Sequence, residues 1–342
     1  MKVNEEKHRH FTIFRLPSAV GIASGMWWNR GVHLLSSTEW QPLVDRHVAT
    51  NPKPVIVVLG PTCSGKTGFS LEVCRVLRGR GEVVNADSRQ FYNGMDIGTA
   101  KITDEERGSV PHHLFSVLDP KEPVTIAWYQ EQANRVIAEI HARGNVPVLV
   151  GGSMLYISAV VDGLRPLPEA DPELRKELEK NYDEDDGWSL YDELAKVDPE
   201  TAKSFDKANK QYVVRAVELY RLTGFPPSTL KKTVPPDFQS LLLGLEWPRD
   251  ELTKRIDART PQLVNGGWIA EVESLLDQGY TEHDPGFKSH GYREIVQWLR
   301  SDEQNKEQLI EVIAAKTRQY AKRQMTWWKD DDRIQWIDAR QL

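Results

Sequence analysis

One stretch near the start of the chain, an apolar run followed by a glycine-framed turn, constrains the fold more than any other. Residues 55–59 read Val-Ile-Val-Val-Leu, and such a short β-branched run is typical of a buried strand in a parallel sheet. Residues 60–67 match the pattern G-x-x-x-x-G-K-[ST], and the apolar spacing over 68–77 predicts a helix. Strand, turn and helix in this order are typical of a phosphate-binding loop.

The residue types in this turn match what a phosphate or pyrophosphate group requires. Gly60 and Gly65 let successive backbone N–H groups point inward, and the N-terminus of the following helix adds partial positive charge. Lys66 is placed to reach the terminal phosphates, and the Thr67 hydroxyl to ligate Mg²⁺, the one cofactor that we expect. The predicted phosphate-binding residues are Gly60, Pro61, Thr62, Cys63, Ser64, Gly65, Lys66 and Thr67.

Composition narrows the class of protein. The chain has 342 residues, of which 39% are apolar and 27% charged, as in ordinary soluble proteins. No apolar run has the length of a membrane span. Cys63 and Cys74 lack metal-ligand spacing and give no sign of a disulfide scaffold, so we expect a reducing, cytoplasmic setting. We also expect a monomer. The net charge of −6 does not indicate a nucleic-acid binder, although a local basic surface would suffice.

The chain divides into an extension, a core and an insertion. Residues 1–53 show no sustained periodicity, and we expect a poorly ordered extension. Residues 54–163 and 236–342 alternate predicted strands and helices, which indicates an α/β core with helices on both faces of a parallel sheet. Residues 164–235 begin with a proline-rich linker and are predicted to form a mainly helical insertion. Further strands are expected at 82–86, 111–118, 146–150, 240–245 and 333–337, and helices at 126–143, 211–222 and 250–265.

Two polar features follow the predicted strand at 82–86. Asp87 stands at its carboxyl end, where the ligand crevice of an α/β sheet lies, although a helix-capping role also fits this residue type. His112 and His113 are predicted to be structural, because no third ligand follows at zinc spacing.

Two later helical segments carry positive charge. Arg255 and Arg259 are four residues apart and share one helical face, which could clamp a diphosphate or could equally be solvated. Residues 312–329 hold five basic side chains, no acid and interleaved aromatic rings. This mixture suits a nucleic acid, and it suits a surface helix with a packed aromatic edge comparably well.

The phosphate-binding loop alone leaves kinases, ATPases, GTPase switches and transferases open. The guanine-recognition tetrapeptide Asn-Lys-x-Asp is missing from the sequence, which weakens a GTPase. The predicted strand at 146–150 is followed by Gly-Gly rather than an acid. The strand-end acid of the site must therefore be Asp87, if the site has one.

Several longer strings recur in this order in one family. They cover residues 60–67, 87–90, 94–101, 111–114, 150–156, 290–294 and 317–327. From about residue 54 to residue 338 the chain resembles the tRNA dimethylallyltransferases, also called tRNA isopentenyltransferases. The resemblance implies a P-loop NTPase-like fold. It also implies transfer of a dimethylallyl group from dimethylallyl diphosphate to N6 of the adenine just 3′ of the anticodon, in tRNAs that read codons beginning with U.

The same resemblance implies the catalytic roles. The loop holds a diphosphate as leaving group, and Lys66, Thr67 with Mg²⁺, and Arg259 stabilise the charge that develops on it. Asp87 is the general base that accepts the N6 proton, and Thr62 lies between the diphosphate and the adenine.

The resemblance further implies that the insertion contacts the anticodon stem-loop. It also implies that the target adenine is flipped out of the base stack to reach the site. The implied tRNA contacts are Asp87, Ser88, Arg89, Gln90, Ser153, Gln211, Tyr212, Val213, Val214, Arg215, Lys288, Ser289, His290, Gly291, Tyr292 and Arg293. The chain departs from the family pattern most where Asn209 and Tyr212 replace an Asp and an Arg. A Tyr cannot neutralise a phosphate, so this change concerns the tRNA grip and not the diphosphate chemistry.

Three other functions compete with this one. An adenylate isopentenyltransferase acting on free AMP would need neither the insertion nor the basic segment 312–329. A small-molecule kinase would turn over ATP without prenyl transfer. An RNA-binding adaptor with a relic loop would not need Lys66, Thr67 and Asp87 intact.

Overall fold

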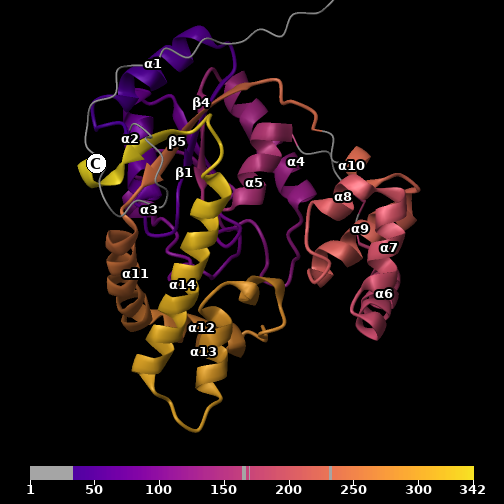
Figure 1. Cartoon of the computed structure of the whole chain (residues 1–342). Helices are drawn as coiled ribbons and strands as arrows, with labels where there is room; N and C mark the ends of the chain where they lie inside the picture. The colour runs from indigo at the N-terminus through magenta and orange to yellow at the C-terminus, as the bar shows by residue number, and fades with distance from the viewer. Residues whose placement is uncertain (1–33, 164–166, 169, 231–232) are drawn as a thin grey trace, which may run out of the picture.

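The computed structural model describes residues 34–163, 167–168, 170–230 and 233–342. A six-stranded sheet forms its centre in the order β3-β2-β4-β1-β5-β6, and each neighbouring pair is parallel. The predicted parallel α/β sheet is therefore confirmed (Figure 1). The strands are β1 (Pro54–Leu59), β2 (Gly81–Asn85), β3 (His112–His113), β4 (Val146–Gly151), β5 (Gln239–Glu246) and β6 (Gln335–Asp338).

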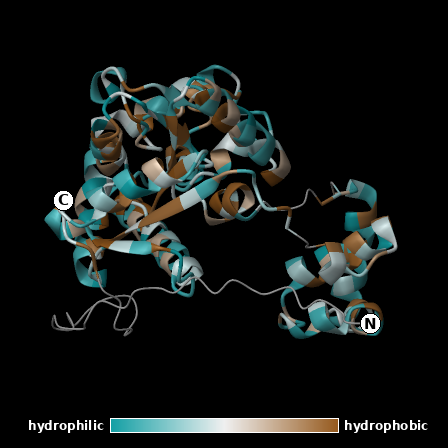
Figure 2. Cartoon of the chain, turned by 90° about the horizontal axis from the view of Figure 1, so that it is seen from above, coloured by the Kyte–Doolittle hydropathy of each residue, from teal (hydrophilic) through white to brown (hydrophobic). Residues whose placement is uncertain are grey.

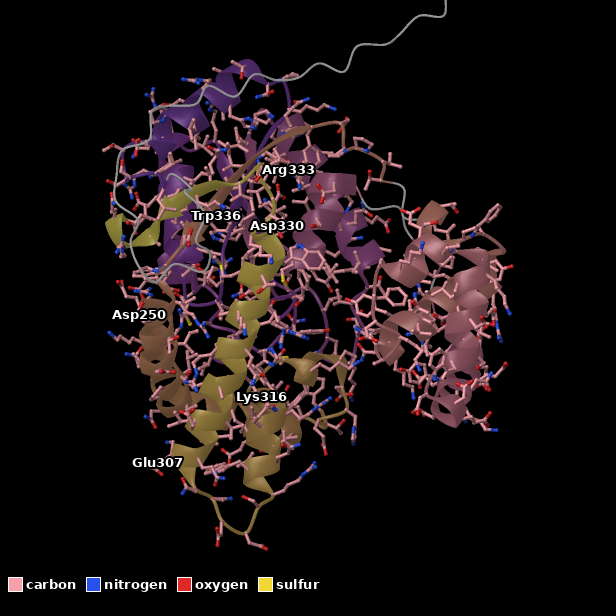
Figure 3. All side chains as sticks on the ribbon, in the orientation of Figure 1. Asp250, Glu307, Lys316, Asp330, Arg333 and Trp336 are labelled. Atoms are coloured by element: carbon pink, nitrogen blue, oxygen red, sulfur yellow. The ribbon has the colours of Figure 1, made fainter. Side chains whose placement is uncertain are left out.

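Helices cover both faces of this sheet. In the core they are α1 (Trp40–Thr50), α2 (Lys66–Val76), α3 (Asp104–Arg107), α4 (Ile126–Ala142), α5 (Met154–Ser158), α11 (Arg249–Leu263), α12 (Ile269–Asp277), α13 (Tyr292–Leu299) and α14 (Lys306–Trp328). Shorter turns of 3₁₀ or π type are η1 (Ala159–Gly163), η2 (Val264–Trp268), η3 (Pro285–Lys288) and η4 (Ala339–Gln341). Figure 3 follows α14 from Glu307 at its outer end, past Lys316, to Asp330 near the sheet.

Strand β1 lies at the centre of the sheet and is buried along its whole length. Its side chains alternate between two apolar clusters, as the period of a strand requires. Val55, Val57 and Leu59 join the cluster beneath α4 and α12–α14, and Ile56 and Val58 join the cluster beneath α1 and α2. A strand covered on both faces needs an unbroken apolar run, which is the pattern that the sequence displays.

The poorly ordered extension expected over residues 1–53 is wrong for its last part. Helix α1 packs on the core, because Trp40 and Val44, one helical turn apart, are both buried. The Trp40 ring meets the Phe69 ring of α2 edge-to-face at 4.8 Å. Just before α1, Leu35 bridges to Ile337 of β6. Residues 1–33 lie outside the described residues.

The strand expected over residues 111–118 is confined to His112–His113. Leu114 and Ser116 have φ angles of 63° and 50°, which an extended strand does not allow. The helix expected over 250–265 ends at Leu263, where η2 follows with Gly267 at a φ of 112°.

Residues 170–230 form a helical lobe beside the core (Figure 2). Its helices are α6 (Pro172–Asp185), α7 (Trp188–Val197), α8 (Pro199–Lys203), α9 (Lys210–Thr223) and α10 (Pro227–Leu230). They enclose an apolar cluster of their own, built from residues such as Leu178, Leu194, Val213 and Val217. The lobe is therefore a second packing unit. Among the described residues, no helix combines the length and the apolar character that a membrane span needs.

A candidate active site at the phosphate-binding loop

The loop between β1 and α2 has the shape that its sequence predicts. Gly60 and Gly65 take φ angles of 154° and 93°, and α2 begins directly afterwards. A Cβ on Gly60 would lie 3.0 Å from Ser64 Oγ and 3.1 Å from the Leu245 carbonyl oxygen, so the loop passes tightly beside β5. Cys63 has a φ of 63°, a left-handed conformation that costs a non-glycine residue on the order of 1 kcal/mol. The turn dictates this backbone conformation against the preference of the residue.

Lys66 lies at the start of α2, and its Nζ donates to the Pro61 carbonyl oxygen at 2.7 Å. Burial lowers the pKa of Lys66 to about 8, although the charge of Asp87 opposes this effect. The positive charge of Arg259 on α11 lowers the same pKa further. Two cations that repel one another are stabilised by an anion between them.

A small cavity brings the predicted phosphate loop and the predicted base together. Lys66 and Thr67 line it on one side, and Asp87 and Gln90 on the other, with Gly151 at the end of β4. The carboxyl ends of β1, β2 and β4 thus meet at one edge of the sheet, where α/β proteins bind their ligands.

Asp87 is fixed by its own backbone and by a buried neighbour. Its N–H donates to Asn85 Oδ1 at 2.8 Å, and its Oδ1 accepts from the Arg89 N–H at 3.0 Å. Asn85 is in turn held by its donation to the Leu114 carbonyl oxygen at 2.9 Å. The carboxylate caps a local turn and not a helix, so the helix-capping interpretation is wrong, and Asp87 lines the cavity.

Three segments distant in the sequence meet beside Asp87. Ser153, which follows β4, accepts a hydrogen bond from the Ser88 N–H at 2.9 Å. Tyr320 of α14 places its hydroxyl 3.4 Å from the Gly152 carbonyl oxygen, and its ring centroid is 5.4 Å from that of His290. Burial raises the pKa of Tyr320 to about 12, and the negative charge of Asp87 contributes. The Tyr320 hydroxyl therefore stays protonated at physiological pH.

The predicted tRNA contacts of residues 288–293 differ in their exposure. Lys288, His290 and Arg293 line a second cavity, together with Lys316 and Arg323 of α14. Ser289, Gly291 and Tyr292 are buried, although Ser289 also lines this cavity. The Ser289 hydroxyl donates to the Gly286 carbonyl oxygen, Gly291 abuts Trp268, and the Tyr292 hydroxyl donates to Glu271.

The predicted contacts of residues 211–215 lie on α9 of the helical lobe. Gln211 and Tyr212 are exposed, whereas Val213 and Val214 face the apolar cluster of the lobe. Arg215 donates to Glu218 and to the Pro168 carbonyl oxygen, both at 2.6 Å. Tyr212 packs against Phe205 with ring centroids 5.7 Å apart. Only part of this string presents its side chains outward.

Arg255 and Arg259 of α11 play different parts. Arg255 Nε donates to the Cys63 carbonyl oxygen at 3.0 Å, and its guanidinium lies 4.2 Å from the Trp247 ring centroid. Arg255 thus supports the loop from outside. Arg259, one turn further along, is exposed and is the arginine of this pair that affects the pKa of Lys66.

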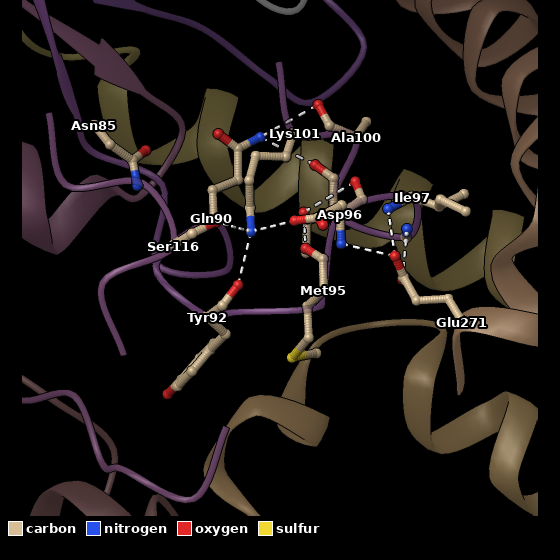
Figure 4. A network of polar contacts seen from close by, with 12 residues as sticks. Asn85, Gln90, Tyr92, Met95, Asp96, Ile97, Ala100, Lys101, Ser116 and Glu271 are labelled. Atoms are coloured by element: carbon tan, nitrogen blue, oxygen red, sulfur yellow. Dashed lines mark hydrogen bonds and ion pairs between the residues drawn. The ribbon is translucent and has the colours of Figure 1, made fainter. Parts of the chain in front are cut away.

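A partly exposed polar network supports the segment between Asp87 and β3 (Figure 4). Glu271 accepts hydrogen bonds from the N–H groups of Asp96, Ile97 and Gly98 at 2.7, 2.6 and 3.2 Å. Lys101 Nζ donates to the Tyr92 carbonyl oxygen, Asp96 Oδ1 and Ser116 Oγ. Gln90 is joined to the same segment, because its Nε2 donates to the Thr99 carbonyl oxygen at 3.0 Å. These hydrogen bonds join the segment 90–101 to α12 and to Ser116.

The histidine pair has structural partners, as the sequence predicts. His113 Nε2 lies 2.6 Å from Glu82 Oε2, and Arg143 and Asn145 donate to the same carboxylate. His112 Nδ1 is 2.8 Å from the Val110 carbonyl oxygen. These contacts fix the two residues of β3 beside β2.

Gln324 of α14 is a residue at the loop that sequence reasoning missed. Its Oε1 accepts from the Thr62 N–H at 2.9 Å, and its Nε2 donates to the Gly152 carbonyl oxygen at 2.7 Å. Its one signal in the sequence is its place within the string 317–327. Spacing along a helix does not reveal a contact with a loop 262 residues away.

Comparisons with known proteins agree with this geometry. The family model described as IPP transferase matches residues 90–331. The tRNA dimethylallyltransferase of Thermomicrobium roseum is 42% identical over 290 residues, which cover 84% of this chain and 87% of that protein. That of Corynebacterium diphtheriae is 40% identical over 291 residues, which cover 84% and 95%.

Two solved structures are also similar. The full-length tRNA isopentenylpyrophosphate transferase from Bacillus halodurans has a TM-score of 0.62 and 37% identity, and the match covers 84% of this chain and 90% of that one. A eukaryotic dimethylallyltransferase acting on tRNA has a TM-score of 0.72 and 28% identity, with 84% and 74% covered.

Proposed function

Because the chain belongs to the IPP transferase family, we propose that it transfers a dimethylallyl group from dimethylallyl diphosphate to a tRNA. The acceptor is N6 of the adenine just 3′ of the anticodon, in tRNAs that read codons beginning with U. The observation that carries this proposal is the cavity in which Lys66 and Thr67 face Asp87. A diphosphate site and a carboxylate that line one cavity suit displacement of a leaving group by an amine.

The phosphate-binding loop holds the leaving group. Backbone N–H groups at the start of α2 and the Lys66 ammonium bind the diphosphate oxygens, and Arg259 adds a second cation. The bond between C1 of the dimethylallyl group and the diphosphate oxygen breaks, and its electron pair leaves with the diphosphate. Donors that face developing charge contribute a few kcal/mol each, about a hundredfold in rate.

Asp87 prepares the nucleophile. The N6 lone pair forms the new bond to C1, and the N6 proton passes to the Asp87 carboxylate. An exocyclic aryl amine is a weak nucleophile, so a base within hydrogen-bond reach and strict positioning supply much of the rate. Ser153, Tyr320 and His290 gather around the carboxylate and surround the space for a flipped base.

The residues around the loop suit Mg²⁺. The exposed Thr67 hydroxyl would hold the ion together with diphosphate oxygens and water, since Mg²⁺ prefers oxygen ligands and keeps several waters. When bound, the ion stabilises negative charge on the diphosphate.

The RNA partner is the anticodon stem-loop. The basic side chains of Lys288, Arg293 and Arg323, which line the second cavity, suit its phosphates, and the exposed end of α9 suits a further contact from the lobe. Free AMP would leave these groups without a use. The two free thiols suit a cytoplasmic location, and we expect the protein to act as a monomer.

One incubation tests the proposal. The protein is mixed with dimethylallyl diphosphate and Mg²⁺, and either an anticodon stem-loop or AMP is offered as acceptor. Mass spectrometry should find the prenyl mass on the stem-loop adenine. Transfer to AMP alone, or hydrolysis of nucleoside triphosphates with both acceptors unmodified, would overturn the proposal.

A further inference from the structure

Gln324 joins three segments that come together only in the folded chain. It lies on the buried face of α14, where its side chain is 1% exposed. The carbonyl oxygen of its amide accepts from the Thr62 N–H in the phosphate-binding loop at 2.9 Å. The amide nitrogen donates to the carbonyl oxygen of Gly152, the residue after β4, at 2.7 Å. Both ends of the amide are thus engaged by backbone.

The hydrogen bond to Gly152 sets which end of the amide faces the loop. A carbonyl oxygen accepts and does not donate, so the NH₂ end must point to Gly152 and the oxygen to Thr62. The fit is close, because a Cβ on Gly152 would lie 2.3 Å from Gln324 Nε2. Glycine at this position lets the amide approach.

The Gln324 amide contributes two directional hydrogen bonds, which an apolar side chain of the same volume could not make. An apolar side chain of equal length would fill the same space without burying polar atoms, which carry a desolvation cost. The hydrogen bonds offset that cost, and in return they hold one loop residue at a defined position. That residue, Thr62, is thereby tied through the Gln324 amide to Gly152, which adjoins the Ser153 side chain that accepts from the Ser88 N–H.

We propose that Gln324 is a positioning residue that acts through Thr62, holding it between the diphosphate and the incoming amine. This inference rests on the proposed prenyl transfer. The loop N–H groups at the start of α2, and Lys66 itself, have no contact with Gln324 among the described hydrogen bonds. Loss of the amide should therefore reduce kcat and leave the KM for dimethylallyl diphosphate nearly unchanged.

The first test replaces the amide by an apolar side chain of similar length. Gln324→Met leaves the Thr62 N–H buried without an acceptor, and kcat for prenyl transfer to the stem-loop should fall about tenfold or more. The KM for dimethylallyl diphosphate should change less than about twofold. Gln308→Met, at an exposed glutamine in the first turn of the same helix, is the matched control and should keep the wild-type kcat.

The second test asks whether Gln324 acts through Thr62. In a Thr62→Ala background, Gln324→Met should cost less than about twofold in kcat, because the side chain that it positions is already gone. Should Gln324→Met fail to fold, Gln324→Ala, which also removes the acceptor for the Thr62 N–H, enters the same cycle.

Two further results would contradict the role of Gln324, and a third would contradict the proposed function as well. Multiplicative effects in the double variant, or a lowered melting temperature with an unchanged kcat, would overturn the inference while the proposed function stands. A wild-type protein that transfers no prenyl group to RNA would overturn both.

Discussion

Lys66 is the residue whose environment the fold changes most at the loop. Burial lowers its pKa to about 8 from the ordinary 10.5, and Arg259 adds to the effect. A lowered lysine pKa means that the ammonium form is complete below pH 8 and is lost as the pH rises through that value. The free enzyme therefore attracts a diphosphate best in neutral and mildly acidic solution.

We predict that kcat/KM for dimethylallyl diphosphate falls above pH 8. If only the ammonium form binds productively, the fall approaches tenfold per pH unit, because kcat/KM reports the pKa of the free enzyme. A profile measured from pH 6.5 to 9.5 with saturating stem-loop checks this. Lys66→Arg, whose guanidinium stays charged, should lose the alkaline fall even if its rate is low. A wild-type profile that stays flat to pH 9.5 would show that the pKa of Lys66 is not lowered to about 8.

Asp87 allows a substitution that removes the base and keeps the turn. Asp87→Asn retains an oxygen for the Arg89 N–H but accepts no proton, so kcat should fall about a hundredfold to ten-thousandfold. Stem-loop affinity, measured by fluorescence anisotropy, should stay within a few-fold of wild type. A near-normal rate would exclude Asp87 as the base.

At the scale of elements, α14 and α9 serve different parts of the molecule. α14 passes from the second cavity, through Tyr320 beside Asp87, to Gln324 at the loop. Its Trp328 is packed in the core, as the packed aromatic edge requires, and its Lys316 and Arg323 line the second cavity, whereas a contact with a nucleic acid stays a prediction. α9 instead presents Gln211 and Tyr212 at its start and buries the next two residues.

Tyr212 gives a prediction about the RNA contact of α9. It is 57% exposed, and Arg215 is occupied by Glu218, so this end of α9 offers little free positive charge. Tyr212→Arg should raise stem-loop affinity severalfold at low salt and steepen the slope of log K against log salt by about 1. Titrations at several salt concentrations measure this.

Leu222→Arg, at an exposed position near the other end of α9, is the matched control for added charge. It should leave the slope unchanged. If both variants steepen the slope equally, the effect comes from net charge and not from a contact at Tyr212.

At the scale of the whole molecule, the helical lobe and the core have separate apolar clusters. The ends of the lobe nevertheless meet, since the Val234 N–H donates to the Gly163 carbonyl oxygen at 2.7 Å. A short linker can therefore replace the lobe without moving the chain on either side.

We predict that a variant in which a short Gly-Ser linker replaces residues 164–233 folds and binds dimethylallyl diphosphate within a few-fold of the full chain. Its stem-loop affinity should fall at least about tenfold, because the lobe supplies part of the RNA grip. Calorimetry measures the affinity for dimethylallyl diphosphate and the affinity for the stem-loop in separate titrations. Undiminished stem-loop binding would show that the core alone grips the RNA.

The sequence alone was sufficient for the features whose physical cause is local. The phosphate-binding loop follows from the glycine positions and the residues beside them, and β1 from an unbroken apolar run. The parallel sheet follows from the alternation of such runs with helical periods. Asp87 could be assigned to the loop because the carboxyl ends of parallel strands meet at one edge.

Only the tertiary structure decided the features that depend on a distant partner. Packing of Trp40 against Phe69 of α2 stabilises α1. The apolar pattern of α1 is too short to predict that contact from the sequence. Likewise, Tyr292 and Val213 stand in strings of predicted tRNA contacts, but the structure buries both side chains in the core. Gln324 matters because the fold brings α14 against a loop far away in the chain. A residue pattern records propensity and period, and it does not record which surface a side chain will meet.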